Sequence, residues 1–209
     1  MATVAMKPSG HRHKGKHSLS RIRIIGGQWR SRQLSVPLVD GLRPTGERVR
    51  ETLFNWLSPY IHGSRCLDLF AGTGALGLEA LSRGASFCQF VEQDPSANRL
   101  LHDNIAKLTD ERDSYHLAQT DAGLFLQSHA NTKSFDIVFM DPPFAQDLWQ
   151  TSFQHLLSGG WLHLGTLIYL EQPKQGIYAP PACRRIKHKI AGQVSFSLYC
   201  FDGEQKPIQ

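Results

Sequence analysis

From residue 65 onward, short apolar runs alternate with longer stretches in which apolar residues recur every three or four positions. Such alternation is typical of strands and amphipathic helices that follow one another along the chain. It favours an α/β domain with a mainly parallel sheet, because each helix returns the chain to the edge where the next strand begins. The expected strands are 65–70, 87–92, 115–119, 135–140 and 167–171, and the expected helices are 74–83, 95–108, 122–129 and 146–157.

The last two apolar runs, 184–190 and 194–201, have no helix between them. They are joined through Ala191, Gly192 and Gln193, a connection too short for a parallel crossover. We therefore expect an antiparallel pair at the edge of the sheet. The predicted fold class is α/β, with a seven-stranded, mostly parallel sheet that ends in an antiparallel C-terminal strand pair.

A β-hairpin is predicted between residues 21 and 37, where β-forming residues flank Gly26 and Gly27. This dipeptide can supply the positive φ angles of a two-residue turn. Such a turn would pair Arg23 with Arg30 and would separate a packing face from a face of directly opposed arginines, which is unfavourable without an anion. The packing face would hold Ile22, Ile24 and Trp29, and the basic face Arg21, Arg23, Arg30 and Arg32. The alternative is an arginine face that is simply solvated.

A helix is expected after the hairpin, with Thr45 as its N-cap and Glu47 in its first turn. Its apolar residues, Val49, Leu53, Trp56 and Leu57, have helical spacing, and Ser58-Pro59 ends it. Arg48 and Arg50 would extend the basic surface of the hairpin, or they would form an ordinary solvated helix face. The hairpin and this helix form an N-terminal extension of the α/β domain.

Composition adds a charge asymmetry to this picture. The chain has 209 residues, 41% of them hydrophobic, and a net charge of +5, and residues 1–50 hold eleven Lys and Arg against two acids. That segment therefore has a charge of +9 and the remainder −4, which favours a polyanion such as nucleic acid as the partner. A solvated basic tail is the alternative for residues 1–20.

Several classes of protein are excluded by the composition. No apolar run approaches the roughly 18 residues of a membrane helix, and Lys, Arg and His occupy the N-terminus where a signal peptide would be apolar. The four cysteines are far apart and form no CxxC pair, so we expect neither disulfides nor a metal site. We expect a cytoplasmic, monomeric protein that does not associate with membranes.

A glycine-rich turn follows the first expected strand of the α/β domain. Gly72, Gly74 and Gly77 fit the pattern G-x-G-x-x-G, which alone is weak evidence for a dinucleotide site. Asp68 precedes the turn, where a dehydrogenase usually has no acid and where the ammonium of a methionine moiety would be favourable. This favours S-adenosylmethionine as the cofactor, with S-adenosylhomocysteine as its product.

Two further acids follow the next two strands. Glu92 can accept hydrogen bonds from ribose hydroxyls, and Asp121 from the adenine amine, although Asp121 can instead cap the following helix. Asp94, before Pro95, is expected to be a helix cap and not a ligand. The expected cofactor-binding residues are Asp68, Phe70, Ala71, Gly72, Thr73, Gly74, Glu92, Asp121 and Ala122.

The expected catalytic residues are Asp141, Pro142, Pro143 and Phe144, directly after the strand 135–140. A proline pair cannot continue a central strand, and it fixes the backbone so that a carbonyl oxygen and the Asp141 carboxylate point into the cleft. These two acceptors suit an exocyclic nucleobase amine, because they favour a pyramidal nitrogen with its lone pair aimed at a methyl sulfonium. Phe144 could stack on the extruded base. The alternative is a turn that merely ends the strand.

With this tetrad the chain resembles Rossmann-like, S-adenosylmethionine-dependent methyltransferases that act on amines. From about Arg21 to Phe201 it is similar to the RsmD family of bacterial 16S rRNA guanine-N2 methyltransferases. The segments that carry this similarity are RIIGGQWR at 23–30, LRPT at 42–45, RVRETLFNWL at 48–57 and AGQV at 191–194.

The resemblance implies methylation of N2 of one guanine, guanine 966 of 16S rRNA, on the small ribosomal subunit. We expect three parts of the chain: a basic tail (1–20), which lies outside the resemblance and whose composition predicts disorder, an RNA-binding hairpin and helix (21–60) and a methyltransferase domain (61–209). The residues implied to bind RNA are Arg21, Arg23, Arg30, Arg32, Arg43 and Arg48.

Three other functions stay open from the sequence. A DNA adenine-N6 methyltransferase would use the same tetrad, but such enzymes usually need a larger target-recognition region than 60 residues. A ribosome-assembly protein could keep the fold without catalysis, although the glycine turn and the tetrad are both intact. A nicotinamide dehydrogenase would leave the tetrad without a purpose.

Overall fold

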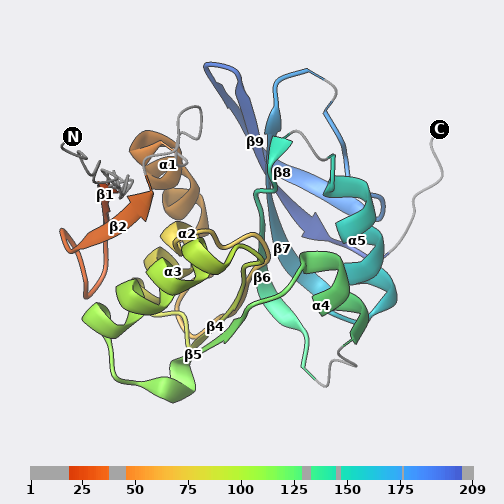
Figure 1. The fold of residues 1–209 in the computed structure, drawn as a ribbon. Coiled ribbons are helices and arrows are strands. Elements are labelled where there is room, and N and C mark those ends of the chain that lie inside the picture. The colour runs from red at the N-terminus through yellow and green to blue at the C-terminus, as the bar shows by residue number, and fades with distance from the viewer. Residues whose placement is uncertain (1–18, 38–45, 129–132, 145–146, 176, 204–209) are drawn as a thin grey trace, which may run out of the picture.

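The computed structural model describes residues 19–37, 46–128, 133–144, 147–175 and 177–203. The predicted N-terminal tail, 1–20, lies almost entirely outside the described residues. Within them, a seven-stranded sheet forms the centre of the molecule, and a separate two-stranded hairpin lies beside it (Figure 1).

The central sheet confirms the predicted fold class. Its strands run in the order β5-β4-β3-β6-β7-β9-β8, and β3 to β7 are parallel. Strand β9 is antiparallel to both β7 and β8. The strands are β3 (Arg65–Asp68), β4 (Phe87–Val91), β5 (Tyr115–Ala118), β6 (Phe135–Met140), β7 (Leu162–Pro173), β8 (Cys183–Ala191) and β9 (Val194–Phe201).

The C-terminal strands form the predicted antiparallel pair at one edge of the sheet, with β8 outermost and β9 between β7 and β8. The order fits the side chains: Phe196, Leu198 and Tyr199 of β9 are buried, whereas most of β8 is exposed and carries Lys187 and Lys189. An apolar strand gains by being covered on both sides, and a charged strand is suited to a sheet edge.

Helices cover the two faces of the sheet and bury two apolar clusters (Figure 1). One cluster is formed with α1 (Glu47–Leu57), α2 (Ala75–Ser82) and α3 (Pro95–Leu108), and the other with α4 (Ala122–Ser128) and α5 (Trp149–Ser158). Neighbouring strand residues alternate between them, as Cys66 and Leu67 do, because successive side chains point to opposite faces. A 3-10 turn, Arg112–Ser114, precedes β5. None of the described helices is long and apolar enough to cross a membrane.

The predicted two-residue hairpin turn is wrong. Strands β1 (Leu19–Arg23) and β2 (Gln33–Pro37) are antiparallel, but Arg23 pairs with Gln33, so residues 24–32 form a longer loop between them. This loop docks on α2: the backbone N–H of Gln28 donates to the Ser82 carbonyl oxygen at 2.8 Å. A Cβ atom on Gly27, whose φ is +76°, would lie 1.8 Å from that oxygen, so Gly27 serves close packing and not a tight turn.

The docked loop still buries the predicted packing residues. Ile24 and Trp29 are buried, and Ile22 packs against the same core. The predicted pairs of directly opposed arginines are not present in these strands, because the register places Arg21 opposite Ser35 and Arg23 opposite Gln33. Tertiary contacts with α2 therefore override the local preference of the glycine pair.

Helix α1 joins this extension to the sheet. Its N-cap is Gly46 and not Thr45, which lies outside the described residues. Val49, Leu53 and Leu57 are buried as expected, and the Trp56 ring stacks on Phe196 of β9 at a centroid distance of 5.3 Å.

Arg50 of α1 is buried, with 1% of its surface exposed, and so contributes neither to the predicted basic surface nor to its alternative, a solvated helix face. Its guanidinium lies 3.8 Å from the carboxylate of Glu79, which is also buried. The same carboxylate accepts hydrogen bonds from the backbone N–H groups of Ile25 and Gly26 at 2.7 and 2.9 Å, and from Arg83 at 2.7 Å. Glu79 thus fastens the hairpin loop and α1 to α2.

Candidate active site

The parallel strands β3, β4 and β6 bring three of the predicted acids to one edge of the sheet. Asp68, the last residue of β3, is in register with Phe90 of β4 and Phe139 of β6. Glu92 and Asp141 each follow two residues later, so both continue beyond the carboxyl ends of the strands next to Asp68. Ligands of open α/β sheets bind at this edge, where the connections leave in opposite directions.

The three glycines of the turn between β3 and α2 and of the first turn of α2 serve two different purposes. Gly72, with φ +54°, faces open space, since a Cβ atom there would meet no atom within 4 Å. Gly74 and Gly77 face the core, where an added Cβ would lie 2.4 Å from Leu101 and 2.2 Å from Phe90. Gly72 therefore lets a ligand approach the backbone, and the other two permit the helix to pack closely on the sheet.

Asp68 is a buried carboxyl group beneath this turn. Only 3% of its surface is exposed, and it accepts a hydrogen bond from the Gly77 backbone N–H at 2.9 Å. The pKa of Asp68 is raised to about 7, chiefly by burial; the Gly77 hydrogen bond opposes the shift, and the charge of Glu92 contributes to it. A buried carboxylate with this environment fits a cationic partner, such as the ammonium of a methionine moiety.

Glu92 is half-buried and fixes the shape of the turn. Its carboxylate accepts hydrogen bonds from the backbone N–H of Gly72 and of Asp94, both at 2.7 Å. Other predicted cofactor residues also belong to this turn: the Ala71 N–H donates to the Val91 carbonyl oxygen, and the Thr73 carbonyl oxygen accepts from Asn104. Phe70, beside Ala71, is half-buried. The structure thus brings Asp68, the turn 70–74 and Glu92 together.

Asp121 lies at the start of α4, three residues beyond the end of β5. Its carboxylate accepts a hydrogen bond from the Leu124 N–H at 3.0 Å, so it caps the helix, as the alternative interpretation expected. Ala122, the next residue, is buried. The expected cap role of Asp94 is confirmed, since it accepts from the N–H groups of Ser96 and Ala97.

The tetrad Asp141–Phe144 follows β6 without continuing it. Asp141 is half-buried, Pro142 is buried, and 40% of the Phe144 surface is exposed. The Phe144 ring lies 6.0 Å from the ring of Trp149 in α5, at an angle of 44°. One aromatic surface is thus held close in sequence to the acid and remains accessible for stacking.

Sequence reasoning missed one acid at this edge, Glu171 near the end of β7. Met140 pairs with Leu170, so Asp141 and Glu171 are the next residues along two neighbouring strands. Glu171 is buried, and the Tyr169 hydroxyl donates to its carboxylate at 2.7 Å. The sequence signal was present, because the apolar run 167–170 ends in an acid just as 87–91 ends before Glu92.

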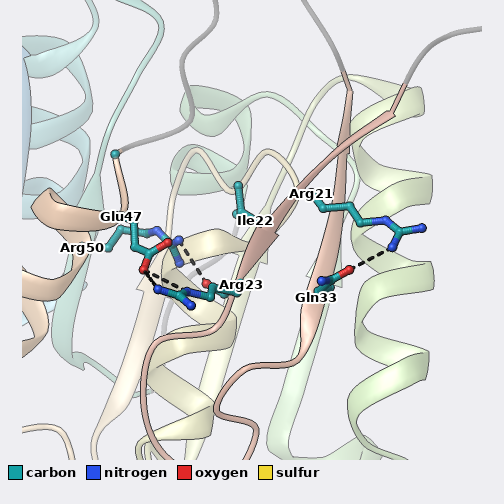
Figure 2. A pocket seen from close by; sticks show the side chains of 7 residues that line it. Arg21, Ile22, Arg23, Gln33, Glu47 and Arg50 are labelled. Atoms are coloured by element: carbon teal, nitrogen blue, oxygen red, sulfur yellow. Dashed lines mark hydrogen bonds and ion pairs between the residues drawn. The ribbon is translucent and has the colours of Figure 1, made fainter.

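Some of the basic residues of the extension line a pocket together with residues at the start of α1. Figure 2 shows this pocket of about 390 Å³, in which Arg23 donates to Glu47 and Arg21 donates to Gln33, each at 2.9 Å. Arg32 instead reaches the Lys107 carbonyl oxygen. The single arginine face of the prediction is therefore wrong, because β1 and the loop 24–32 direct their arginines to separate partners.

The remaining predicted RNA-binding residues are exposed or lie outside the description. Arg30 in the loop and Arg48 in the first turn of α1 are both exposed, and Arg43 lies outside the described residues. Together with Arg21, Arg23 and Arg32, which are also exposed, they keep the extension basic.

Comparisons with known proteins agree with this architecture. A family model described as Conserved hypothetical protein 95 matches residues 22–200. The ribosomal RNA small subunit methyltransferase D of Escherichia coli K12 is 46% identical over 189 residues, covering 89% of this chain and 93% of the relative. The protein of the same name from Haemophilus influenzae is 44% identical over 179 residues, covering 85% and 93%.

A solved structure, that of the Escherichia coli protein yhhF, superposes with a TM-score of 0.77 and 40% identity. The match covers 88% of this chain and all of that chain. Identity of this extent over nearly the whole of both sequences means that the chain belongs to the ribosomal RNA small subunit methyltransferase D family.

Proposed function

We propose that this protein transfers a methyl group from S-adenosylmethionine to the exocyclic N2 amine of a guanine in 16S rRNA, at position 966. The observation that carries the proposal is the position of Asp141–Phe144, which directly follows β6, the sheet neighbour of the strand that leads into the glycine turn. A site for an amine acceptor and a site for a methyl donor are thereby adjacent.

The cofactor would be held by residues of the turn and the strand ends. Asp68 would bind the ammonium group, and Glu92 the ribose hydroxyls in exchange for one of its backbone hydrogen bonds. The open space above Gly72 suits the approach of a ligand to the backbone. S-adenosylmethionine supplies an electrophilic methyl group at its sulfonium. Phe70, Ala71, Thr73, Gly74, Asp121 and Ala122 would complete the site.

The tetrad would prepare the amine for attack. The nitrogen lone pair of a guanine amine is delocalised into the ring, so the amine is a poor nucleophile. The Asp141 carboxylate and a proline carbonyl oxygen would accept its two hydrogens and favour a pyramidal nitrogen, an effect that is strongest in the transition state. Phe144 would stack on the extruded base and Pro142 and Pro143 would keep the acceptors rigid.

The N-terminal extension would hold the RNA. Its exposed arginines, Arg21, Arg23, Arg30, Arg32 and Arg48, can bind phosphates, and Arg43 precedes α1 in the sequence. Because Glu79 and Ser82 fasten the extension to α2, RNA bound there would be held at a fixed distance from the glycine turn.

The test is labelled methyl transfer to unmodified small ribosomal subunits, to free 16S RNA and to duplex DNA, followed by mass spectrometry of the nucleosides. N2-methylguanosine on subunits or RNA is the expected product. If N6-methyladenine formed in DNA instead, the protein would be a DNA adenine methyltransferase and the proposed function would be wrong. RNA binding without any product would identify a non-catalytic assembly protein.

A further inference from the structure

We infer that the edge strand β8 is a second RNA-binding surface, on which Lys187 and Lys189 bind phosphates near the target base. This inference rests on the proposed function, and it adds a contact that the N-terminal extension does not provide. The chemistry recognised by β8 is the phosphate backbone of RNA, which fixes the position of the RNA without reading its sequence.

The charge of β8 contrasts with that of the domain to which it belongs. Residues 51–209 have a net charge of −4, yet the nine residues of β8 include four Lys and Arg and no acid. Arg184 is paired with Asp202 at 3.2 Å. Arg185, Lys187 and Lys189 are exposed and make no ion pair with any described residue. Three like charges on one exposed strand repel one another, so a bound anion would be favourable there.

The sheet register places the end of β8 level with the tetrad. Strand β9 is antiparallel to both β7 and β8, so β7 and β8 run in the same direction and end at the same edge of the sheet. Lys189 pairs with Phe196, which in turn pairs with Glu171, the neighbour of Asp141 across β6 and β7. With about 4.8 Å between adjacent strands, the three steps from β8 to β6 amount to about 14 Å. One RNA molecule can span that distance.

The two lysines lie on the sheet face that α1 covers. Directly paired residues of antiparallel strands point to the same face, and the partners of Lys187 and Lys189 are Leu198 and Phe196. The Trp56 ring of α1 stacks on Phe196 from that side. The lysines of β8 therefore point to the same side of the sheet as the N-terminal extension.

The tetrad lies between the two basic surfaces in the order of the strands. The extension is fastened to α2 through Glu79 and Ser82, and α2 follows β3. Strands β3 and β7 are the two neighbours of β6, which leads into the tetrad, and β8 is the edge strand beyond β7 and β9 (Figure 1). An RNA whose target base reaches the tetrad can therefore contact the extension on one side and β8 on the other.

A protein that adds a strand to β8 fits this edge less well than RNA. The register of β8 against β9 shifts between Arg185 and Lys187, and Ile186 at the shift packs against the core. Such an irregularity interrupts the row of backbone groups that an added strand would pair with, and edge lysines disfavour strand addition further. Phosphates require only accessible cations, and the exposed lysines provide them.

The experiment measures binding of unmodified 16S RNA to the full chain at several salt concentrations, with S-adenosylhomocysteine present. In Lys187→Gln with Lys189→Gln, the steepness of log K against log salt concentration should fall by about 1 to 2, because fewer counterions are displaced. Lys187→Arg with Lys189→Arg keeps both charges and should keep the wild-type slope. Arg112→Gln, an exposed arginine before β5, is the control and should also keep it. The melting temperature of each variant reports whether it is folded.

Combination with the extension tests whether the two surfaces bind separate phosphates. Arg30→Gln and Arg48→Gln, added to the two glutamine substitutions in β8, should reduce the steepness by about 2 to 4 in total, because contacts to separate phosphates contribute additively. If β8 acted only through the extension, the combined loss would equal that of the arginine substitutions alone, and the inference would be wrong.

The other outcomes are equally distinct. An unchanged slope in folded Lys187→Gln with Lys189→Gln would overturn the inference, and so would an equal loss in the arginine variant, which keeps the charge. Weaker binding to intact small subunits without weaker binding to free 16S RNA would identify a ribosomal protein as the partner of β8 instead. If wild-type protein binds neither the RNA nor the subunits, the proposed function itself fails.

Discussion

The buried carboxyl group of Asp68 should make the stability of the ligand-free protein fall as the pH rises. Its pKa is raised from 3.8 to about 7, chiefly by burial. At low pH both the folded and the unfolded state hold the proton. Between these two pKa values the folded protein keeps a proton that the unfolded chain has released, so ionisation progressively favours unfolding.

The magnitude follows from the two pKa values. Between pH 5 and about pH 7, a range of about two pH units, the folded protein holds about one proton more than the unfolded chain. At about 1.4 kcal/mol for each pH unit, the free energy of unfolding should fall by about 3 kcal/mol from pH 5 to pH 8. Asp68→Asn removes this dependence, because an amide does not titrate, while its oxygen can still accept from the Gly77 N–H. The predicted signal is the difference in the free energy of unfolding between the two proteins at each pH, because the contributions of the other titrating groups cancel in it.

Urea unfolding at pH 5, 6, 7 and 8 measures this difference, with Asp110→Asn, an exposed acid, as the control. S-adenosylhomocysteine provides a second readout, because its ammonium should favour the ionised carboxylate. Calorimetry at pH 6 in buffers of different ionisation enthalpy should show release of up to one proton on binding. Parallel stability curves for wild type and Asp68→Asn would refute the reasoning.

Three further predictions concern the extension, the glycine turn and the RNA. Glu79→Ala should lower the free energy of unfolding by about 3 to 5 kcal/mol in urea, because Arg50 is left buried without its counter-charge, and adding Arg50→Met should recover part of the loss. Gly74→Ala should lower the melting temperature more than Gly72→Ala, whereas Gly72→Ala should lose more affinity for S-adenosylmethionine, since of these two glycines Gly72 faces open space and Gly74 faces Leu101; the reverse order would count against the assigned roles. Arg30→Gln with Arg48→Gln should reduce the steepness of log K against log salt concentration for binding of 16S RNA by about 1 to 2, with Arg112→Gln as the control. An unaltered slope would mean that these arginines are ordinary solvated residues that do not bind RNA phosphates.

The sheet and its helices could be predicted because their signals are local. Apolar periodicity sets the face that each helix or strand buries, and the short connection at Gly192 requires an antiparallel pair. The acids at the strand ends followed from the same pattern, and Glu171 could have been included by extending it to the strand at 167–171.

The errors arose where distant parts of the chain meet. The glycine pair at 26–27 has the local preference of a tight turn, but contacts with Ser82 and Glu79 convert it into a docking loop. Arg50 has the charge of a surface residue, and only the buried Glu79 carboxylate makes its interior position favourable. Neither partner can be identified from the neighbouring sequence.

The measurement that tests the central claim most directly is a single-turnover methyl-transfer rate for Asp141→Ala, combined with its dissociation constant for S-adenosylmethionine. The rate should fall by about 100-fold or more, because an acceptor needed mainly in the transition state is lost, while cofactor affinity stays within about twofold. Asp147→Asn, at a nearby exposed position whose positive φ asparagine tolerates, should leave both unchanged. An unchanged rate in Asp141→Ala, or an equal loss of cofactor binding, would contradict the account.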